Sequence, residues 1–183
     1  MSVLRGRMRH VEVTTAGLTT PVGPLGIAVS ERGLCRVEWS QPPGRVAKPA
    51  GLALRVIEQL EAYFTGELRE FDLPIDWSFA TGTRLAVLQA LHRVPYGTAV
   101  TYGELAELSG TGVPPRAIGG IMGANPMPIV VPCHRVVAHD GLGGYSGGGR
   151  AYDGREVKRW LLVMEGALPP TLDWDPAGLP AAT

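Results

Sequence analysis

Cys133 and His134 are neighbours in the stretch Pro132-Cys133-His134-Arg135-Val136. A thiol is a strong nucleophile only as a thiolate, and a nearby imidazole or cation favours that form. On a strand, adjacent side chains point to opposite faces, so a turn or a bridging water must bring sulfur and imidazole together. The proline and the apolar residues before the pair predict a buried nucleophile. The alternative is a small buried hydrophobe, which is our interpretation of Cys35.

Two features after this pair support a reactive cysteine. The loop over residues 140–149 is rich in glycine, so its backbone could approach a planar ligand closely; a flexible linker is the alternative. An amphipathic helix then ends near Gly166, and Glu165 falls in its last turn, where the helix dipole disfavours a carboxylate. A carboxylate there needs a partner, and an imidazole is suitable. Glu165, His134 and Cys133 would then act as orienter, base and nucleophile.

Two short helices before the cysteine form a predicted helix-turn-helix. Thr101 and Glu104 have capping-box spacing, so the first helix should begin at Tyr102. A break with two glycines and two prolines precedes the second, which should span about 116–124. Small residues would let this helix approach a nucleic-acid backbone, and plain helix packing is the alternative. The residues offered to such a partner are Arg116, Ala117 and Gly119.

The first half of the chain predicts a small sheet with a helix laid on it. Short apolar stretches between about 10 and 39 are typical of strands, and residues 21–26 are expected to form a turn. Val56, Ile57, Leu60, Tyr63 and Phe64 share one face of a helix. The titratable residues of this half show no catalytic grouping, so we expect a structural role for it.

Composition excludes several classes of protein. The chain has 183 residues, with 17 Lys and Arg against 17 Asp and Glu, so a purely electrostatic DNA binder is not expected. Two cysteines cannot form a disulfide framework, which favours a reducing cytoplasm. No apolar run is long enough to cross a bilayer, and the N-terminus does not resemble a secretory signal. Cysteine and histidine spacings do not fit a metal site.

Taken together, these motifs resemble the O6-alkylguanine-DNA alkyltransferase family, also called methylated-DNA–protein-cysteine methyltransferases. The resemblance covers most of the chain, and the Pro-Cys-His-Arg-Val stretch is highly specific. The other matching segments are 62–68, 71–74, 94–97, 101–106, 116–119, Asn125-Pro126, 144–148, Trp160-Leu161-Leu162 and Glu165-Gly166.

The family resemblance implies an α+β fold in two domains. Residues 1–78 would be a ribonuclease H-like sheet-plus-helix domain. Residues 79–168 would be a helical domain with a winged helix-turn-helix, and residues 169–183 a tail. The stretch 150–156 is longer than the family's usual connection beside the pocket loop. The cysteine and histidine set of zinc-binding relatives is absent, so neither structural zinc nor any other cofactor is expected.

The same resemblance implies a role for each site residue. Cys133 would accept the alkyl group, His134 would take its proton through a water, and Glu165 would orient His134. Asn125 would brace the active-site turn, and Tyr102 would donate a hydrogen bond and crowd a DNA phosphate. The base pocket would be lined by Tyr145, Ser146, Gly147 and the backbone of Cys133 and Val136. The DNA contacts would come from Arg116, Ala117, Gly119, Arg135 and Tyr102.

The activity implied is irreversible, single-turnover DNA repair. The partner would be double-stranded DNA, bound in its minor groove by a cytoplasmic monomer with no membrane association, and the target would be a flipped-out O6-alkylguanine, with O4-alkylthymine as a second lesion. One alternative is a non-catalytic or regulatory protein that binds alkylated DNA. Another is a cysteine hydrolase, for which adjacent Cys133 and His134 are awkwardly placed.

Overall fold

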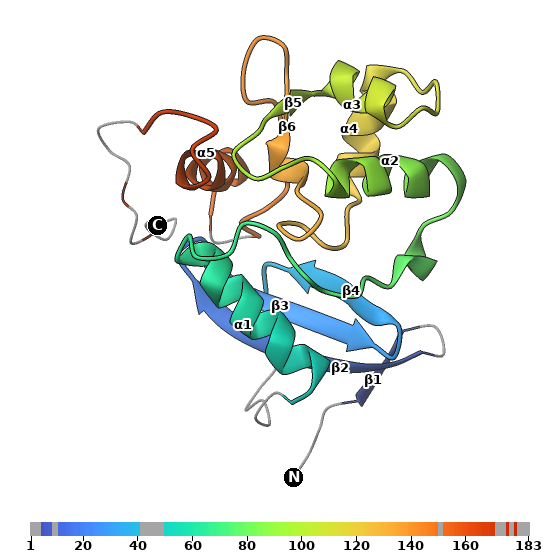
Figure 1. Cartoon of the computed structure of the whole chain (residues 1–183), viewed down its shortest axis with the longest axis vertical. Coiled ribbons are helices and arrows are strands. Elements are labelled where there is room, and N and C mark those ends of the chain that lie inside the picture. The colour runs from blue at the N-terminus through green and yellow to red at the C-terminus, as the bar shows by residue number, and fades with distance from the viewer. Residues whose placement is uncertain are drawn as a thin grey trace.

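The computed structural model describes residues 5–8, 11–40, 50–149, 152–170, 175 and 178. Its first part is an antiparallel sheet in which each strand pairs with the next along the chain. Helix α1 (Leu52–Phe64) lies along one face of this sheet (Figure 1). The four strands, in order across the sheet, are β1 (Arg5–Met8), β2 (Val11–Thr20), β3 (Gly23–Ser30) and β4 (Gly33–Glu38).

The predicted sheet and helix are both present, with one correction. The expected turn over 21–26 is shorter, because only the first two of these residues turn and Gly23 already begins β3. Gly23 has a φ of 103°, a backbone conformation that glycine adopts at little cost, so the chain can reverse direction there. Helix α1 buries the apolar face that its sequence spacing predicts, including Val56, Leu60 and Tyr63.

The second part of the chain is mainly helical. The capping box before α3 is confirmed, since Thr101 Oγ1 accepts from the Glu104 amide at 3.1 Å and the Glu104 carboxylate accepts from the Thr101 amide at 2.6 Å. A 3₁₀ turn, η1 (Trp77–Phe79), precedes this part. Its elements are α2 (Gly82–His92), β5 (Val100–Thr101), α3 (Tyr102–Leu108), α4 (Pro115–Gly123), the 3₁₀ turn η2 (Cys133–Arg135), β6 (Val136–Val137) and α5 (Gly154–Met164).

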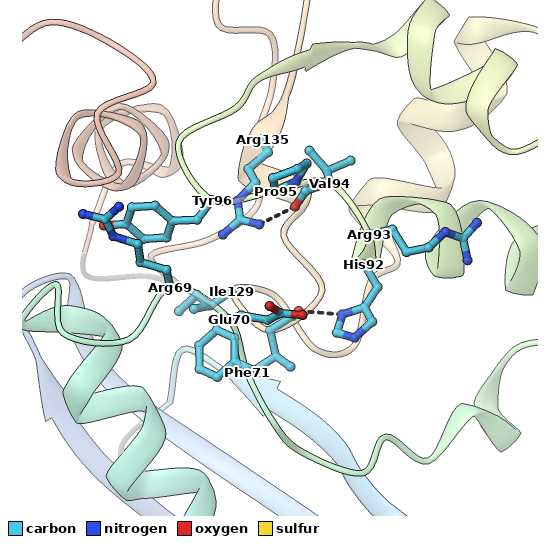
Figure 2. A pocket seen from close by; sticks show the side chains of 11 residues that line it. Arg69, Glu70, Phe71, His92, Arg93, Val94, Pro95, Tyr96, Ile129 and Arg135 are labelled. Atoms are coloured by element: carbon cyan, nitrogen blue, oxygen red, sulfur yellow. Dashed lines mark hydrogen bonds between the residues drawn. The ribbon is translucent and has the colours of Figure 1, made fainter.

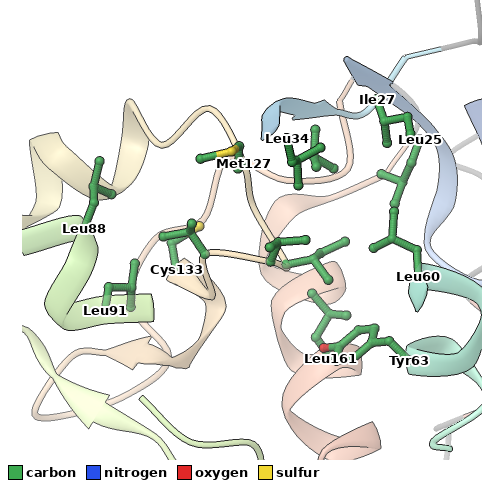
Figure 3. Close-up of a cluster of buried hydrophobic side chains, with 14 of the residues drawn as sticks. Leu25, Ile27, Leu34, Leu60, Tyr63, Leu88, Leu91, Met127, Cys133 and Leu161 are labelled. Atoms are coloured by element: carbon green, nitrogen blue, oxygen red, sulfur yellow. The ribbon is translucent and has the colours of Figure 1, made fainter. Parts of the chain in front are cut away.

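One buried apolar cluster joins the sheet to the helices. Figure 3 shows Leu25 and Leu60 on one side, Leu161 of α5 beside Tyr63, and Met127 and Cys133 toward the helices. Because interiors pack densely, this shared core fixes the sheet relative to the segment that carries Cys133. In the described part of the chain, no helix is both long and apolar enough to cross a membrane. Most of the predicted tail 169–183, and the first four residues, lie outside the described residues.

Candidate active site

A braced turn carries Cys133. The Asn125 amide donates to the carbonyl of Val131 at 2.7 Å, and its oxygen accepts from the amide of Met127 at 3.1 Å. The turn also holds Ile129 at a φ of 76°, an unfavourable conformation for a β-branched residue, which the surrounding contacts must maintain. The side chain of Asn125 therefore closes the loop that leads to the cysteine.

The 3₁₀ turn η2 resolves the problem of adjacent Cys133 and His134. With three residues per turn, neighbouring side chains are about 120° apart rather than on opposite faces. Both residues are buried, with His134 fully excluded from solvent. The short turn thus removes the strand geometry that would place the sulfur and the imidazole on opposite faces.

Glu165 is the centre of a buried ionic network. It accepts from His134 Nε2 at 2.9 Å, and its two oxygens accept from Arg135 Nη2 at 2.8 Å and Nε at 2.9 Å. Burial alone would raise the pKa of Glu165, but the hydrogen bonds and charges of His134 and Arg135 lower it far below its ordinary value. The carboxylate at the end of α5 is therefore paired with the imidazole of His134, as its unfavourable position at the helix C-terminus predicts.

Tyr63 joins this network from the first half of the chain. Its hydroxyl, on the buried face of α1, donates to Glu165 Oε1 at 2.7 Å. Burial and the nearby Glu165 charge raise the pKa of Tyr63 well above its ordinary value, so the hydroxyl stays protonated and donates. The first half, expected to be structural because its titratable residues show no catalytic grouping, here contributes a hydrogen bond to this network. No sequence signal could have found a contact across 102 residues.

His134 has one free acceptor. A proton on Nε2 serves Glu165, so Nδ1 carries the lone pair, and Nδ1 is buried without a hydrogen-bond partner among the described residues. Burial lowers the pKa of His134 despite Glu165, and burial raises the pKa of the Cys133 thiol. The neighbouring imidazole therefore does not keep Cys133 ionised at rest: the thiol and the imidazole are both neutral, and the imidazole can accept a proton.

Lys158 is a second residue that sequence reasoning missed. Its ammonium is fully buried and donates to the carbonyls of Val136 at 2.5 Å and Gly144 at 3.2 Å. Burial lowers its pKa to about 8, whereas the Cys133 charge acts in the opposite direction. The Lys158 charge in turn lowers the pKa of Cys133, partly offsetting the burial of that thiol. A lysine on the inner face of the amphipathic pattern of α5 was the signal available in the sequence.

Replacing Lys158 with methionine is expected to make Cys133 less acidic. Losing a nearby positive charge should raise the thiol pKa, so the reaction profile should move to higher pH and the rate at pH 7 should fall severalfold. The measurement is the pH dependence of Cys133 carbamidomethylation by iodoacetamide, followed on the Cys133 peptide by mass spectrometry. Arg159→Met, on the exposed side of α5, is the matched control. An unchanged profile in Lys158→Met would show that the ammonium does not act on the sulfur.

A cavity of about 330 Å³ opens beside Cys133. This volume lies in the range of small-molecule sites. Burial, followed by the Cys133 charge, raises the pKa of Tyr102, so this hydroxyl remains protonated as a donor. Tyr145 has its hydroxyl buried without a hydrogen-bond partner among the described residues. The lining consists of Tyr102, Gly119, Met122, Gly123, Cys133, Gly144, Tyr145 and Ser146.

Three predicted site residues lie elsewhere. Arg135 is buried, and its guanidinium donates to Glu165 and to the carbonyl of Val94, so its assignment as a DNA contact is wrong. Gly147 lies behind the Tyr145 ring rather than on the cavity wall, because a Cβ there would meet that ring at 2.1 Å. Val136 is also absent from the lining, and its carbonyl accepts from Lys158. Arg116 and Gly119 are exposed on α4, with Ala117 half-buried between them.

A second cavity, of about 480 Å³, has Arg135 in its lining. In Figure 2 the Tyr96 ring lies between the side chains of Arg69 and Arg135, with Phe71 and His92 farther along the wall. No cysteine lines this cavity. Within the described ranges, no cluster of three metal-ligating side chains occurs, and both cysteines are free.

Comparison with known families places this geometry in context. Residues 14–77 match the family description "6-O-methylguanine DNA methyltransferase, ribonuclease-like domain". Residues 83–167 match "6-O-methylguanine DNA methyltransferase, DNA binding domain". The two matches leave only the connecting residues 78–82 between them.

Individual relatives cover most of this chain. A "DNA base-flipping protein" of Thermus thermophilus is 44% identical over 154 residues, which is 82% of this chain and 99% of the relative. A "Methylated-DNA--protein-cysteine methyltransferase" of Methanosarcina acetivorans is 36% identical, and the match covers 81% of this chain and 95% of the relative. The crystal structure of Mycobacterium tuberculosis OGT in complex with DNA has a TM-score of 0.71 at 36% identity, covering 84% of this chain and 92% of that one. The chain belongs to the 6-O-methylguanine DNA methyltransferase family.

Proposed function

We propose that this protein repairs DNA by moving an alkyl group, methyl above all, from O6 of guanine to the sulfur of Cys133. The observation that carries the proposal is the position of Cys133 on the wall of a cavity of about 330 Å³, followed directly in the chain by His134, which pairs with Glu165. The second lesion proposed is O4-alkylthymine. The relatives named for methylated DNA and for DNA complexes support the choice of substrate.

The residues around the sulfur account for the proton and the charge. The thiol proton passes to Nδ1 of His134 through a bridging water, and Glu165 stabilises the resulting imidazolium. The sulfur then attacks the alkyl carbon, so that a carbon–sulfur bond forms as the carbon–oxygen bond breaks. The electron pair stays on guanine, where the protonated Tyr102 hydroxyl is the hydrogen-bond donor. The product thioether has no easy hydrolytic exit, so each molecule acts once.

The helices α3 and α4 are proposed to hold the DNA. A base inside a duplex cannot reach a buried sulfur, so the nucleotide must be flipped out at a cost of a few kcal/mol. Gly119 lines the cavity and Arg116 is exposed at the start of the same helix, which supports a minor-groove approach with Arg116 filling the emptied stack. We accordingly propose a winged helix-turn-helix domain over 79–168, a ribonuclease H-like domain over 1–78, and a cytoplasmic monomer.

Mass spectrometry of the reacted protein tests this proposal. The protein is incubated with a duplex carrying one O6-methylguanine, and its peptides are then analysed. We expect one methyl group on the Cys133 peptide, none on the Cys35 peptide, and unmodified guanine in the DNA. An unmethylated Cys133 with the lesion intact would overturn the proposal.

A second candidate function is binding of alkylated DNA without transfer. The observation in its favour is the 44% identity to a relative named as a DNA base-flipping protein. The nucleophile and its pair are nevertheless present in this chain as Cys133 and His134. Lesion-specific binding that leaves the methyl group on guanine would select this function over repair.

Arg116→Ala is expected to weaken repair in duplex DNA far more than reaction with the free base. If Arg116 replaces the extruded nucleotide, its loss should cost about 1–3 kcal/mol of stacking, or roughly a tenfold to hundredfold drop in rate. The free base needs no extrusion, so its rate should stay unchanged. The control is Arg159→Ala, an exposed arginine on α5. Equal losses on both substrates would remove the extrusion role.

A further inference from the structure

The end of β4 and the residue after it contact two segments that lead to or line the cavity. The amide of Val37 donates to the carbonyl of Pro126 at 2.8 Å, in the braced turn that leads to Cys133. Two residues later, the Trp39 ring meets the Tyr145 ring edge-on, with centroids 6.0 Å apart and an interplanar angle of 86°. The last residues of β4 and Trp39 directly after them therefore support both the cysteine side and the tyrosine side of the cavity. Neither Val37, in β4, nor Trp39, just after the end of β4, lines the cavity itself.

Trp39 is held firmly in this position. Its indole Nε1 donates to the carbonyl of Val22 at 3.0 Å, in the turn between β2 and β3. Gly149 lies directly on the tryptophan backbone, since a Cβ there would come within 2.9 Å of the Trp39 carbonyl oxygen. The tryptophan is thus anchored to the sheet on one side and to the glycine-rich loop on the other.

Tyr145 has little room to move away from the cavity. Trp39 contacts it on one side, and the backbone of Gly147 packs so closely that a Cβ would meet the tyrosine ring at 2.1 Å. A further contact lies just beyond the glycine-rich loop, where the Tyr152 ring packs on Gly23 and occupies the space that a side chain there would need. Because these contacts are dense and are anchored to the sheet, moving the Tyr145 ring away from the cavity would disrupt packing and cost free energy.

We propose that Trp39 is a positioning residue that sets the width of the cavity through Tyr145, and so limits the size of the alkyl group that reaches Cys133. This inference rests on the proposed function. A methyl group on O6 of guanine adds one carbon, whereas a butyl group needs the wall to move. The cost of moving that wall falls on the larger substrate alone, so the N-terminal sheet acts as a specificity element for a reaction that takes place in the helical part.

The test compares two lesions in matched duplexes. Rates of transfer from O6-methylguanine and from O6-butylguanine are measured for the original protein, Trp39→Ala and Trp39→Phe. If the cavity in Trp39→Ala admits two or three more carbon atoms of the alkyl group, the butyl-to-methyl rate ratio should rise about tenfold or more. Trp39→Phe keeps an aromatic ring at this position, so its rate ratio should lie between those of the original protein and Trp39→Ala. The control is Trp77→Ala, because Trp77 packs on Phe79 and His92, away from the Tyr145 wall.

Each outcome separates a specificity role from a structural one. An unchanged ratio, including an equal fall in both rates, would overturn the inference, as would the same rise in Trp77→Ala. Where Trp39→Ala does not fold, as judged by thermal denaturation, the ratio in Trp39→Phe decides. If the original protein transfers no alkyl group, the proposed function fails but the inference does not: the ratio of affinities for the two lesions, measured with Cys133→Ala alone and combined with Trp39→Phe, must still shift toward butyl.

Discussion

Cys133→Ala is expected to abolish alkyl transfer completely while leaving the binding of lesion DNA within about twofold. No other described cysteine is near the cavity, since Cys35 is on β4 with its thiol on the carbonyl of Ala28. The sulfur contributes reactivity, whereas the helices and the loop contribute the binding surface. Transfer is measured by methyl on protein peptides, and binding by fluorescence anisotropy of a labelled duplex carrying O6-methylguanine.

Cys35→Ala serves as the matched control and should transfer at the original rate. Burial raises the pKa of Cys35, with Asp76 adding to the effect, so its thiol is a poor nucleophile as well as a distant one. Transfer that survives in Cys133→Ala would show that the wrong nucleophile had been identified. Loss of both transfer and binding, with the fold intact, would mean that the sulfur also contributes to recognition.

Glu165→Gln is expected to slow transfer by about a hundredfold or more and to destabilise the fold by about 3–5 kcal/mol near pH 7. The amide keeps the shape but cannot neutralise Arg135, so a buried guanidinium is left without its counter-ion. The amide also no longer stabilises the imidazolium on His134, which underlies the kinetic loss. Urea denaturation and single-turnover rates measure the two effects. Glu104→Gln, an exposed acid of the capping box, should change both far less.

The Glu165 contribution to stability must also depend on pH. The folded protein holds the pKa of Glu165 below its unfolded value of about 4.3, so the contribution is complete above that pH. As pH falls from about 4.3 toward the folded pKa, the unfolded state binds the proton first and the contribution is lost. The original protein should therefore lose more stability than Glu165→Gln between pH 5 and pH 3. Parallel curves for the two proteins would contradict the depressed pKa.

Local elements were predictable because their signals are local. The capping box at Thr101 and Glu104 and the apolar face of α1 depend on residues three or four apart, where a helix brings side chains together. The pairing of Glu165 with His134 joins residues 31 apart, and it was predictable because the unfavourable position of the carboxylate against the helix dipole is itself a local signal. The match of Pro-Cys-His-Arg-Val to a known family supplied the chemistry.

Burial overturned several expectations that considered residue type alone. Arg135 is chemically suited to a phosphate, yet it is buried, and there its charge pairs with Glu165 instead of DNA. Cys133 has an imidazole for a neighbour, yet removal from water raises its pKa. The desolvation of a charge depends on every atom around it, so it cannot be deduced from neighbours in the sequence.

By itself, the sequence determined the nucleophile and the helices around it from motifs and spacings within short segments. It also pointed to the His134–Glu165 pair, although these residues are 31 positions apart, because a carboxylate at a helix C-terminus needs a partner. Only the tertiary structure decided that Tyr63 donates to Glu165, that Lys158 lies buried near the sulfur, and that Trp39 supports Tyr145. These contacts join residues that are far apart in the chain or come from different elements. They exist because one continuous core packs the N-terminal sheet against the turn of Cys133, and no local pattern specifies which side chains meet across such a core.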